Sequence, residues 1–279
     1  MASLKEDLRN LAIRITTDRR RAELVERRRE KRNKIRRSTT ASISPGQYNM
    51  CFVGNPGTGK TAIARYMAKV FYSLGIIEHP RVMEIRGLDL TGEYLGQTKA
   101  KVNDIFEKNA GCVIVIDEVY SLLSPRAHNT DSYGQQAIDT LVGCITDPRN
   151  ATTVVVIAGY KDRMDEFLAA NQGLASRFGT TIEFHPYTDS DCVKILHKLL
   201  EDTEFDYPKD DEFRQQLVSL FANIRKQMGV NFGNARTVGS IFKQIIDKQT
   251  VRVHQLDNPG ENELFTVLPV DIPQHPQST

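Results

Sequence analysis

Hydrophobic and polar positions alternate in a way that divides the chain into regions. From residue 46 to about residue 184, short apolar runs are separated by amphipathic segments with helical spacing. The apolar runs are Met50–Val53, Val82–Ile85, Cys112–Ile116, Thr153–Ala158 and Ile182–Phe184. Runs of this length are typical of strands in a parallel sheet whose crossover connections are helices. The pattern therefore predicts an α/β domain with helices on both faces of the sheet.

The pattern changes period at Pro186 and Tyr187. The amphipathic segments that follow have helical spacing, with no convincing strand: Asp189–Leu200, Asp210–Lys226 and Asn234–Val253. We expect a small helical domain over residues 187–255. Beyond it, four prolines and few apolar residues predict a disordered tail over residues 256–279.

The N-terminal region is helical in pattern and strongly basic. Residues 1–37 hold 14 Lys/Arg and 6 Asp/Glu, whereas the remainder holds 23 and 29. Such a segment suits nucleic acid, an anionic membrane or an acidic partner. Because acidic residues are interleaved and no aromatic residue is present to stack on bases, a solvated charged helix is favoured and nucleic-acid binding disfavoured. We expect a helical segment and linker over residues 1–44, before a domain spanning residues 45–186.

Composition restricts the class of protein. A hydrophobic content of 40% with 26% charged residues is typical of a globular chain, and no apolar run reaches the roughly 18 residues needed to cross a bilayer. The four cysteines are far apart and form no CxxC pair, so neither a zinc site nor a disulfide framework is expected. We expect no membrane insertion, and a location in the cytoplasm or another reducing intracellular compartment.

One motif carries most of the chemistry. Directly after the first apolar run, the pattern GxxxxGK[ST] is satisfied by Gly54, Asn55, Pro56, Gly57, Thr58, Gly59, Lys60 and Thr61. The glycines allow backbone N–H groups to converge on phosphate oxygens at a helix N-terminus. Lys60 is expected to neutralise the β- and γ-phosphates and the Thr61 hydroxyl to ligate Mg²⁺. ATP and Mg²⁺ are thus the predicted cofactors.

A second motif supplies carboxylates. The apolar run Val113–Ile116 is followed by Asp117 and Glu118. Parallel strands present their carboxyl ends to the ligand. We expect Asp117 to hold Mg²⁺ with its waters, and Glu118 to orient and activate the water that attacks the γ-phosphate.

Together with later phrases, these motifs resemble a known family. GNPGTGKT, VIVIDE, GQQAIDTLV, VIAGYKDRMDEF, LASRFGTTIEF and GNARTV occur in order. They are similar to the AAA+ group that contains red-type Rubisco activase (CbbX/CfxQ), stage V sporulation protein K and the ATPases of type VII secretion. The resemblance covers roughly residues 4–255. It implies a three-layer αβα P-loop NTPase domain with a C-terminal helical lid, assembled as a ring homo-oligomer, expected to be a hexamer.

The resemblance also implies roles for further residues. Tyr94 and Leu95 match the pore loop that grips a client protein. Arg177 matches the arginine finger that reaches the neighbouring subunit's γ-phosphate, and Arg236 matches the second sensor that couples nucleotide state to the lid. On physical grounds alone, Tyr94 also suits a buried turn, Arg177 a structural ion pair and Arg236 a surface charge.

Two departures from the family pattern stand out. The first sensor, commonly Asn or Thr, falls at Ala158-Gly159-Tyr160-Lys161, so Tyr160 or Lys161 is expected to fill its place. The adenine-contacting Ile-Gly-Leu box is missing before Leu4, which suggests a domain cut from a longer protein or another way of holding adenine.

The functional reading is Mg²⁺-dependent ATP hydrolysis that drives remodelling or threading of a client protein through a ring. Three alternatives remain open: a dedicated enzyme activator of the Rubisco-activase kind, an ATP-gated scaffold with slow turnover, and a nucleic-acid-directed motor. The intact Lys60, Asp117, Glu118 and Arg177 weigh against the scaffold. Salt-sensitive binding by residues 1–37 would be needed to support the motor.

Overall fold

The computed structural model describes residues 2–32, 46–92, 94, 96–123 and 131–274. The chain divides into two compact units. The first contains residues 1–54 and 60–184, and the second contains residues 55–59 and 185–279. Each unit is described by itself.

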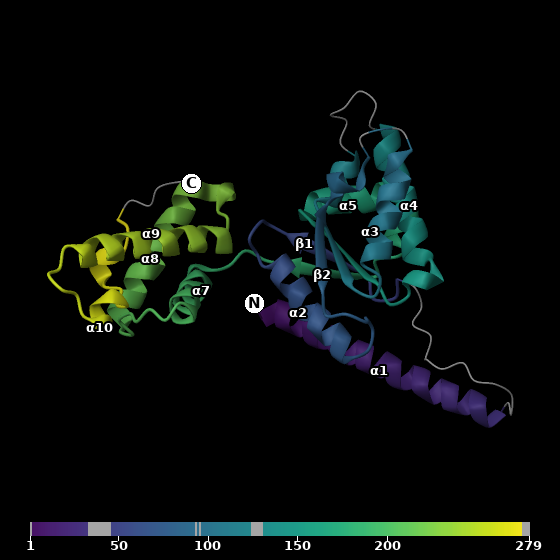
Figure 1. Ribbon diagram of the computed structural model, residues 1–279, viewed down its shortest axis with the longest axis horizontal. Helices are drawn as coiled ribbons and strands as arrows, with labels where there is room; N and C mark the ends of the chain where they lie inside the picture. Colours follow the sequence, from purple (N-terminus) through teal and green to yellow (C-terminus); the bar gives the residue numbers. More distant parts are fainter. Residues whose placement is uncertain (1, 33–45, 93, 95, 124–130, 275–279) are drawn as a thin grey trace. The chain divides into compact units, whose positions relative to one another are not determined.

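The first unit is built on a five-stranded parallel sheet (Figure 1). Its strands are β1 (Met50–Gly54), β2 (Val82–Arg86), β3 (Val113–Asp117), β4 (Val154–Gly159) and β5 (Thr180–Phe184). Their order across the sheet is β2-β3-β4-β1-β5, with every neighbouring pair parallel. The predicted parallel sheet is confirmed, and β1 lies beside β4 rather than beside β2. The crossovers bring the carboxyl ends of β1, β3 and β4 to one edge of the sheet.

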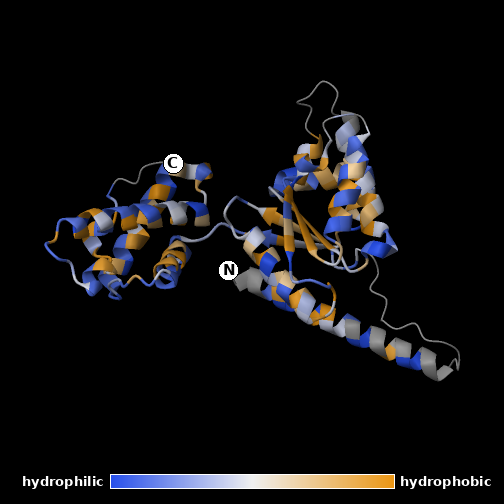
Figure 2. Ribbon diagram, in the orientation of Figure 1, coloured by the Kyte–Doolittle hydropathy of each residue, from blue (hydrophilic) through white to orange (hydrophobic). Residues whose placement is uncertain are grey.

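Helices cover both faces because the strands are apolar on both sides. Alternate residues of β3 enter different cores: Ile114 and Ile116 join one, Val113 and Val115 the other. The first core is closed by α3 (Gln97–Lys108), α4 (Asp131–Thr146) and α5 (Lys161–Ala170), and the second by α2 (Lys60–Ser73) and part of α1 (Ala2–Arg32). Figure 2 shows the strands as the most continuous hydrophobic stretch of this unit. The shorter elements are η1 (Gly87–Leu90), η2 (Val119–Leu123), η3 (Pro148–Asn150) and α6 (Gln172–Ala175).

The N-terminal helix corrects one expectation. Rather than being solvated along its whole length, α1 buries Leu11 and Ile15 in the core against α2 and the sheet. Leu8 packs against the same core. The linker expected after it lies outside the described residues. The first half of α1 is therefore part of the α/β unit.

The second unit is a helical lid made of α7 (Asp189–Asp202), α8 (Asp211–Met228) and α9 (Ala235–His254), with the single turn η4 (Gly229–Asn231) between the last two. The helix starts are fixed by side chains. Thr188 and Asp191 form a capping box on α7, and the Asp210 carboxylate accepts from the N–H of Phe213 at 2.7 Å. The apolar faces of α7, α8 and α9 form one core, in which Leu196, Phe221 and Ile241 are buried.

The C-terminal segment also differs from expectation. A disordered tail is wrong for residues 257–274, which fold onto the lid through α10 (Glu261–Leu264) and η5 (Pro269–Asp271). Val267 is fully buried, and Asp271 is only 1% exposed. Arg252 donates to both carboxylate oxygens of Asp271, at 2.9 and 3.0 Å, and to the Thr266 carbonyl at 2.8 Å. The paired Asp271 carboxylate and the buried Val267 therefore anchor a segment whose composition had predicted disorder.

We expect Asp271→Asn to destabilise the lid. The change leaves the Arg252 guanidinium without its charged partner, which costs about 2 kcal/mol of unfolding free energy. Denaturant unfolding of the full chain, followed in the lid by hydrogen exchange, measures the loss. The matched control is Asp202→Asn, because Asp202 pairs with Lys198 at 2.6 Å on the surface, where screening makes such pairs weak. Equal losses for the two variants would show that the buried pair does not anchor the segment.

Candidate nucleotide-binding site

The glycine-rich loop joins the end of β1 to the start of α2, as the motif predicts. Gly57 has φ +70°, and a Cβ there would lie 2.1 Å from the Gly233 carbonyl oxygen, so no other residue fits without a shift. The Thr58 hydroxyl donates to the Asn55 carbonyl at 2.8 Å and closes the turn. The Lys60 ammonium donates to the Gly54 carbonyl at 2.8 Å. The loop is thus shaped with its lysine held at the N-terminus of α2, where backbone N–H groups and the helix dipole suit an anion.

Residues 55–59 are hydrogen-bonded to the lid, and for this reason they belong to the second unit. The N–H of Ala235 donates to Gly57 O at 3.0 Å, and the Asn234 amide donates to Pro56 O at 3.1 Å. The Tyr187 hydroxyl donates to Thr58 O at 2.8 Å. Sequence reasoning missed Asn234 and Tyr187, although both stand in phrases that were singled out. Through these bonds the phosphate-binding loop and the start of α9 form one structure.

The acidic pair lies at the carboxyl end of β3. In the sheet register Asp117 is opposite Ala158 of β4, and Gly159 of β4 is opposite Val53 of β1. The strand β4 therefore separates the acidic pair from the strand that leads into the loop. Asp117 is half-buried and Glu118 is exposed, so both carboxylates are accessible to a ligand at this edge.

The backbone at Glu118 is unusual. Its φ is +50°, a region that a non-glycine residue occupies at a cost of about 1–3 kcal/mol. Two bonds stabilise this conformation: the Glu118 N–H donates to Asp117 Oδ1 at 3.0 Å, and the Ser121 N–H donates to the Glu118 carbonyl at 2.8 Å. Strain of this kind concentrates at functional sites, and here it turns the chain sharply after Asp117.

The residues proposed as a first sensor lie next to this turn. Tyr160 precedes α5 and is partly exposed, with its ring 6.5 Å from that of Tyr120. Lys161 is engaged elsewhere, in a 3.0 Å ion pair with Glu183 of β5. Of the two candidates, Tyr160 is therefore the one whose side chain lies against a residue near the acidic pair, namely Tyr120. The sensor assignment stays a prediction.

Tyr120 was missed by sequence reasoning. Its ring packs so closely on the end of β4 that a Cβ at Gly159 would lie 2.5 Å from Tyr120 Cε1, and the Arg163 guanidinium lies 5.4 Å from the ring centroid. Burial, with the negative charge of Glu118 as the second cause, raises the pKa of Tyr120 to about 12. Its phenol therefore stays protonated at neutral pH. The only signal in the sequence was an aromatic residue two positions after the acidic pair.

The remaining predicted residues fall at separate places. Tyr94 is 68% exposed in the segment between η1 and α3, and Leu95 lies outside the described residues. Arg177 is half-buried, and its guanidinium donates to the Ser176 hydroxyl at 2.6 Å; among the described residues it has no ion-pair partner. Arg236 is exposed in the first turn of α9, one residue after the Ala235 N–H that binds the loop. Arg177 is thus not held, among the described residues, in the structural ion pair that was its alternative, whereas the exposure of Arg236 fits both a sensor and its alternative, a surface charge.

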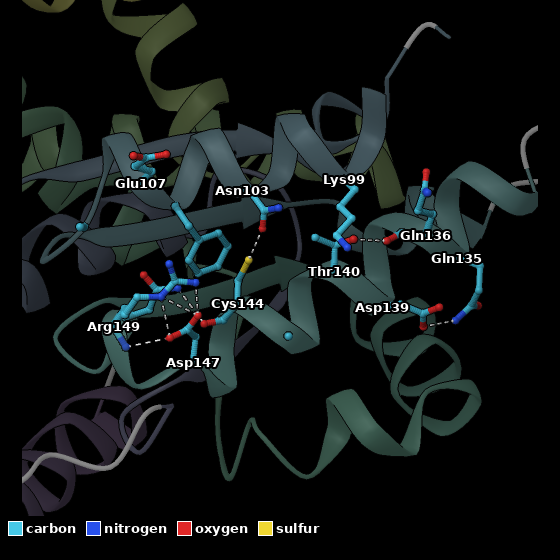
Figure 3. A pocket seen from close by; sticks show the side chains of 14 residues that line it. Lys99, Asn103, Glu107, Gln135, Gln136, Asp139, Thr140, Cys144, Asp147 and Arg149 are labelled. Atoms are coloured by element: carbon cyan, nitrogen blue, oxygen red, sulfur yellow. Dashed lines mark hydrogen bonds and ion pairs between the residues drawn. The ribbon is translucent and has the colours of Figure 1, made fainter. Parts of the chain in front are cut away.

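A cavity of about 1030 Å³ lies between α3 and α4 (Figure 3), and none of the predicted site residues lines it. Most of the residues that line it have polar side chains, and several of these side chains bond one another. The Cys144 thiol donates to Asn103 Oδ1 at 3.3 Å, and Arg149 pairs with Asp147 at 2.6 Å. The cavity is a surface groove on one flank of the sheet, separate from the loop and the acidic pair.

A parallel sheet of this order, with a glycine-rich phosphate loop after β1 and an acidic pair after β3, defines a P-loop ATPase with a helical lid. Comparison with known families agrees. Residues 50–186 match the family described as ATPases associated with various cellular activities (AAA), and residues 188–279 match an AAA lid domain. The chain belongs to the AAA family of ATPases.

The chain is similar to several named proteins over most of its length. Protein CbxX (chromosomal) of Cupriavidus necator is 37% identical, over 86% of this chain and 74% of its own length. Stage V sporulation protein K of Bacillus subtilis is 31% identical, over 86% and 73%. The ESX-3 secretion system protein EccA3 of Mycobacterium leprae is 34% identical over 85% of this chain, which spans only 39% of EccA3.

Solved structures share the fold. The AAA domain of FIGL-1 in complex with ADP superposes with a TM-score of 0.52 at 20% identity, covering 80% of this chain and 69% of that one. At this identity the likeness concerns the fold alone. Among the described residues, no helix has the length and apolar character to cross a bilayer.

Proposed function

We propose that this ATPase hydrolyses ATP with Mg²⁺ at the subunit boundaries of a hexameric ring and uses the cycle to pull on a client protein. The observation that carries the proposal is that β1, which leads into the glycine-rich motif, and β3, which ends in the strained Asp117-Glu118 turn, lie on either side of β4 with their carboxyl ends at one sheet edge. Catalysis of phosphoryl transfer rests on positioning and charge stabilisation, and this edge supplies both.

Each residue at this edge has a role that suits its chemistry. Lys60 is held at the N-terminus of α2, where it can neutralise phosphate charge. The Glu118 carboxylate is exposed beside the loop's edge of the sheet and is suited to orient and deprotonate water. The oxygen donors Thr61 and Asp117 fit a hard cation, and bound Mg²⁺ would neutralise charge on the β- and γ-phosphates.

The lid is suited to report the state of the loop. Because Ala235, Asn234 and Tyr187 bond the carbonyls of residues 56–58, a shift of the loop on nucleotide binding must move the start of α9 or break these bonds. Arg236 follows directly and is exposed, so it is available to a phosphate. This supports its proposed role as the second sensor.

The client-gripping role rests on Tyr94. A tyrosine that is 68% exposed is available to a partner, and aromatic side chains give large contact area with little loss of entropy. The similar proteins are named for sporulation and for a secretion system, so their names point to no single client. Activation of a specific enzyme, which the resemblance of the sequence motifs to the Rubisco-activase group implies, is the second candidate function.

We expect Tyr94→Ala to abolish client capture and leave basal ATP turnover within about twofold, since Tyr94 belongs neither to the glycine-rich motif nor to the acidic pair. The measurement uses the Glu118→Gln chain as a trap in ATP and compares proteins retained from the source cells with and without Tyr94→Ala. The matched control is Tyr66→Ala on α2, where the tyrosine is 60% exposed. If the Glu118→Gln chain retained equal amounts of cellular protein with Tyr94→Ala and with Tyr66→Ala, the result would contradict the pore-loop role.

A further inference from the structure

One edge of the lid is both acidic and apolar. It consists of residues 201–206, at the end of α7, and residues 255–270, after α9; we call it the lid edge. The two segments are joined by backbone bonds of 2.8 Å, from Asp206 N to Phe265 O and from Val267 N to Asp206 O. The rings of Phe205 and Phe265 are 5.8 Å apart. The lid edge is therefore one continuous surface.

Its composition is that of a docking surface. The two segments contain seven Asp/Glu and no Lys or Arg. They also expose large apolar side chains, namely Leu256, Leu264, Phe265, Leu268 and Val270. Leu264 and Phe265 are each 45% exposed although their neighbours Val267 and Ile272 are buried in the lid core. Exposed apolar side chains surrounded by acidic residues indicate a binding partner that is basic and has exposed apolar side chains of its own.

One face of the helix α1 is basic and exposes apolar side chains. Successive helix positions are about 100° apart, so Ile13, Arg20, Leu24 and Arg27 fall within a sector of about 60°. This sector is opposite the buried Leu11 and Ile15. Ile13 is 58% exposed and Leu24 47%. Both arginines are exposed as well.

In the second half of α1, no side chain that the structure describes is buried in its own unit. Residues 16–32 contain eight Lys/Arg against four Asp/Glu, and none of those whose side chains the structure describes is buried. In Figure 1 this half extends past the sheet. A helical segment of this length is marginal in water unless it packs against something. The basic charge of this half, together with the exposed Ile13 and Leu24 of α1, is complementary to the lid edge.

We propose that the lid edge of one copy binds the outward face of α1 of a second copy. Each subunit then offers one of each surface, and the contact is head to tail. Heterologous contacts of this kind close into rings when the rotation permits. The inference rests on the ring of the proposed function and names a surface that holds it together. A nucleic acid is the poorer occupant of α1, because apolar side chains rather than aromatic ones lie between the arginines.

Charge reversal on each side tests the contact in the full chain. The α1 variant is Arg20→Glu with Arg27→Glu, and the lid variant is Glu204→Lys with Glu261→Lys. The matched control reverses two exposed lysines of the lid outside the edge, Lys226→Glu with Lys243→Glu. The mass distribution in ATP is measured against protein concentration for each variant and for an equimolar mixture of the α1 and lid variants.

The proposal expects each variant alone to need about tenfold more protein for half-assembly, because each variant replaces two attractive charges at the contact with two repulsive ones. The mixture moves the midpoint back towards that of the wild type, since the reversed charges of the two variants then face each other between unlike copies, and this recovery also shows that both variants fold. Assembly of the wild type weakens as salt is raised. The control variant assembles as the wild type does.

Two results would overturn the proposal. In the first, each variant assembles like the wild type. In the second, the variants fail to assemble alone and also when mixed, and this result would place the contact within one chain or with a foreign partner. Failure of the ring itself is distinguishable. In that case the wild type stays monomeric in ATP at every concentration, whereas failure of the contact alone leaves an assembling wild type with assembling variants.

Discussion

Replacing Glu118 with glutamine leaves ATP affinity within about threefold of the wild type and lowers turnover about 10²–10⁴-fold. The amide keeps the size and the hydrogen-bonding reach of the carboxylate but cannot accept the proton of the attacking water. Affinity is retained because phosphate is held by the loop, whose geometry is set by Lys60, Gly54 and Gly57 and not by Glu118. Nucleotide binding by fluorescence titration and phosphate release in the steady state give the two quantities.

The matched control for this result is Glu107→Gln, an exposed glutamate of α3 whose neutralisation leaves both quantities unchanged. Parallel losses of affinity and turnover in Glu118→Gln would mean that the residue supports the nucleotide in the ground state. The assignment as general base would then be wrong.

Replacing Arg177 with alanine lowers turnover about 10³-fold, the range expected for removal of an arginine finger. The structure supports such a role, since the guanidinium is partly accessible and bonds only the neighbouring Ser176 hydroxyl among the described residues. Because the residue is proposed to act across a subunit boundary, its loss can be compensated in trans. Mixing Arg177→Ala with Lys60→Ala subunits creates some sites with an intact loop and a donated arginine.

The mixture is expected to recover a measurable fraction of wild-type turnover, although each variant alone is inactive. Arg149→Ala, which removes an exposed guanidinium in η3, serves as the control and keeps full activity. Mixed assemblies without recovered turnover would place Arg177 in its own subunit's site or outside catalysis.

The sheet and its chemistry were predictable because their signals are local. The five apolar runs correspond to β1–β5 within one residue at each end, except that β5 begins two residues before the predicted run, and the glycine-rich motif connects a strand to a helix as predicted. A buried parallel strand needs apolar residues on both faces, and the continuous apolar run Val113–Ile116 meets this requirement. The confirmed family follows from the same motifs.

Features that depend on distant partners were not predictable. The bond from Tyr187 to Thr58 joins residues 129 positions apart, and that from Asn234 to Pro56 joins residues 178 apart. The C-terminal segment looked disordered because its anchor, Asp271, is a charged residue that is buried only because Arg252 meets it. Likewise, the charge of α1 concealed the two apolar residues that fix its first half, Leu11 and Ile15.

The central claim is ATP hydrolysis at sites completed by a neighbouring subunit, and turnover measured against protein concentration tests it most directly. The account predicts that the rate per subunit rises with concentration and levels off where a ring-sized mass appears in ATP, with Glu118→Gln inactive throughout. A rate per subunit that is constant down to concentrations at which the chain is monomeric would contradict it, because each site would then be complete within one chain.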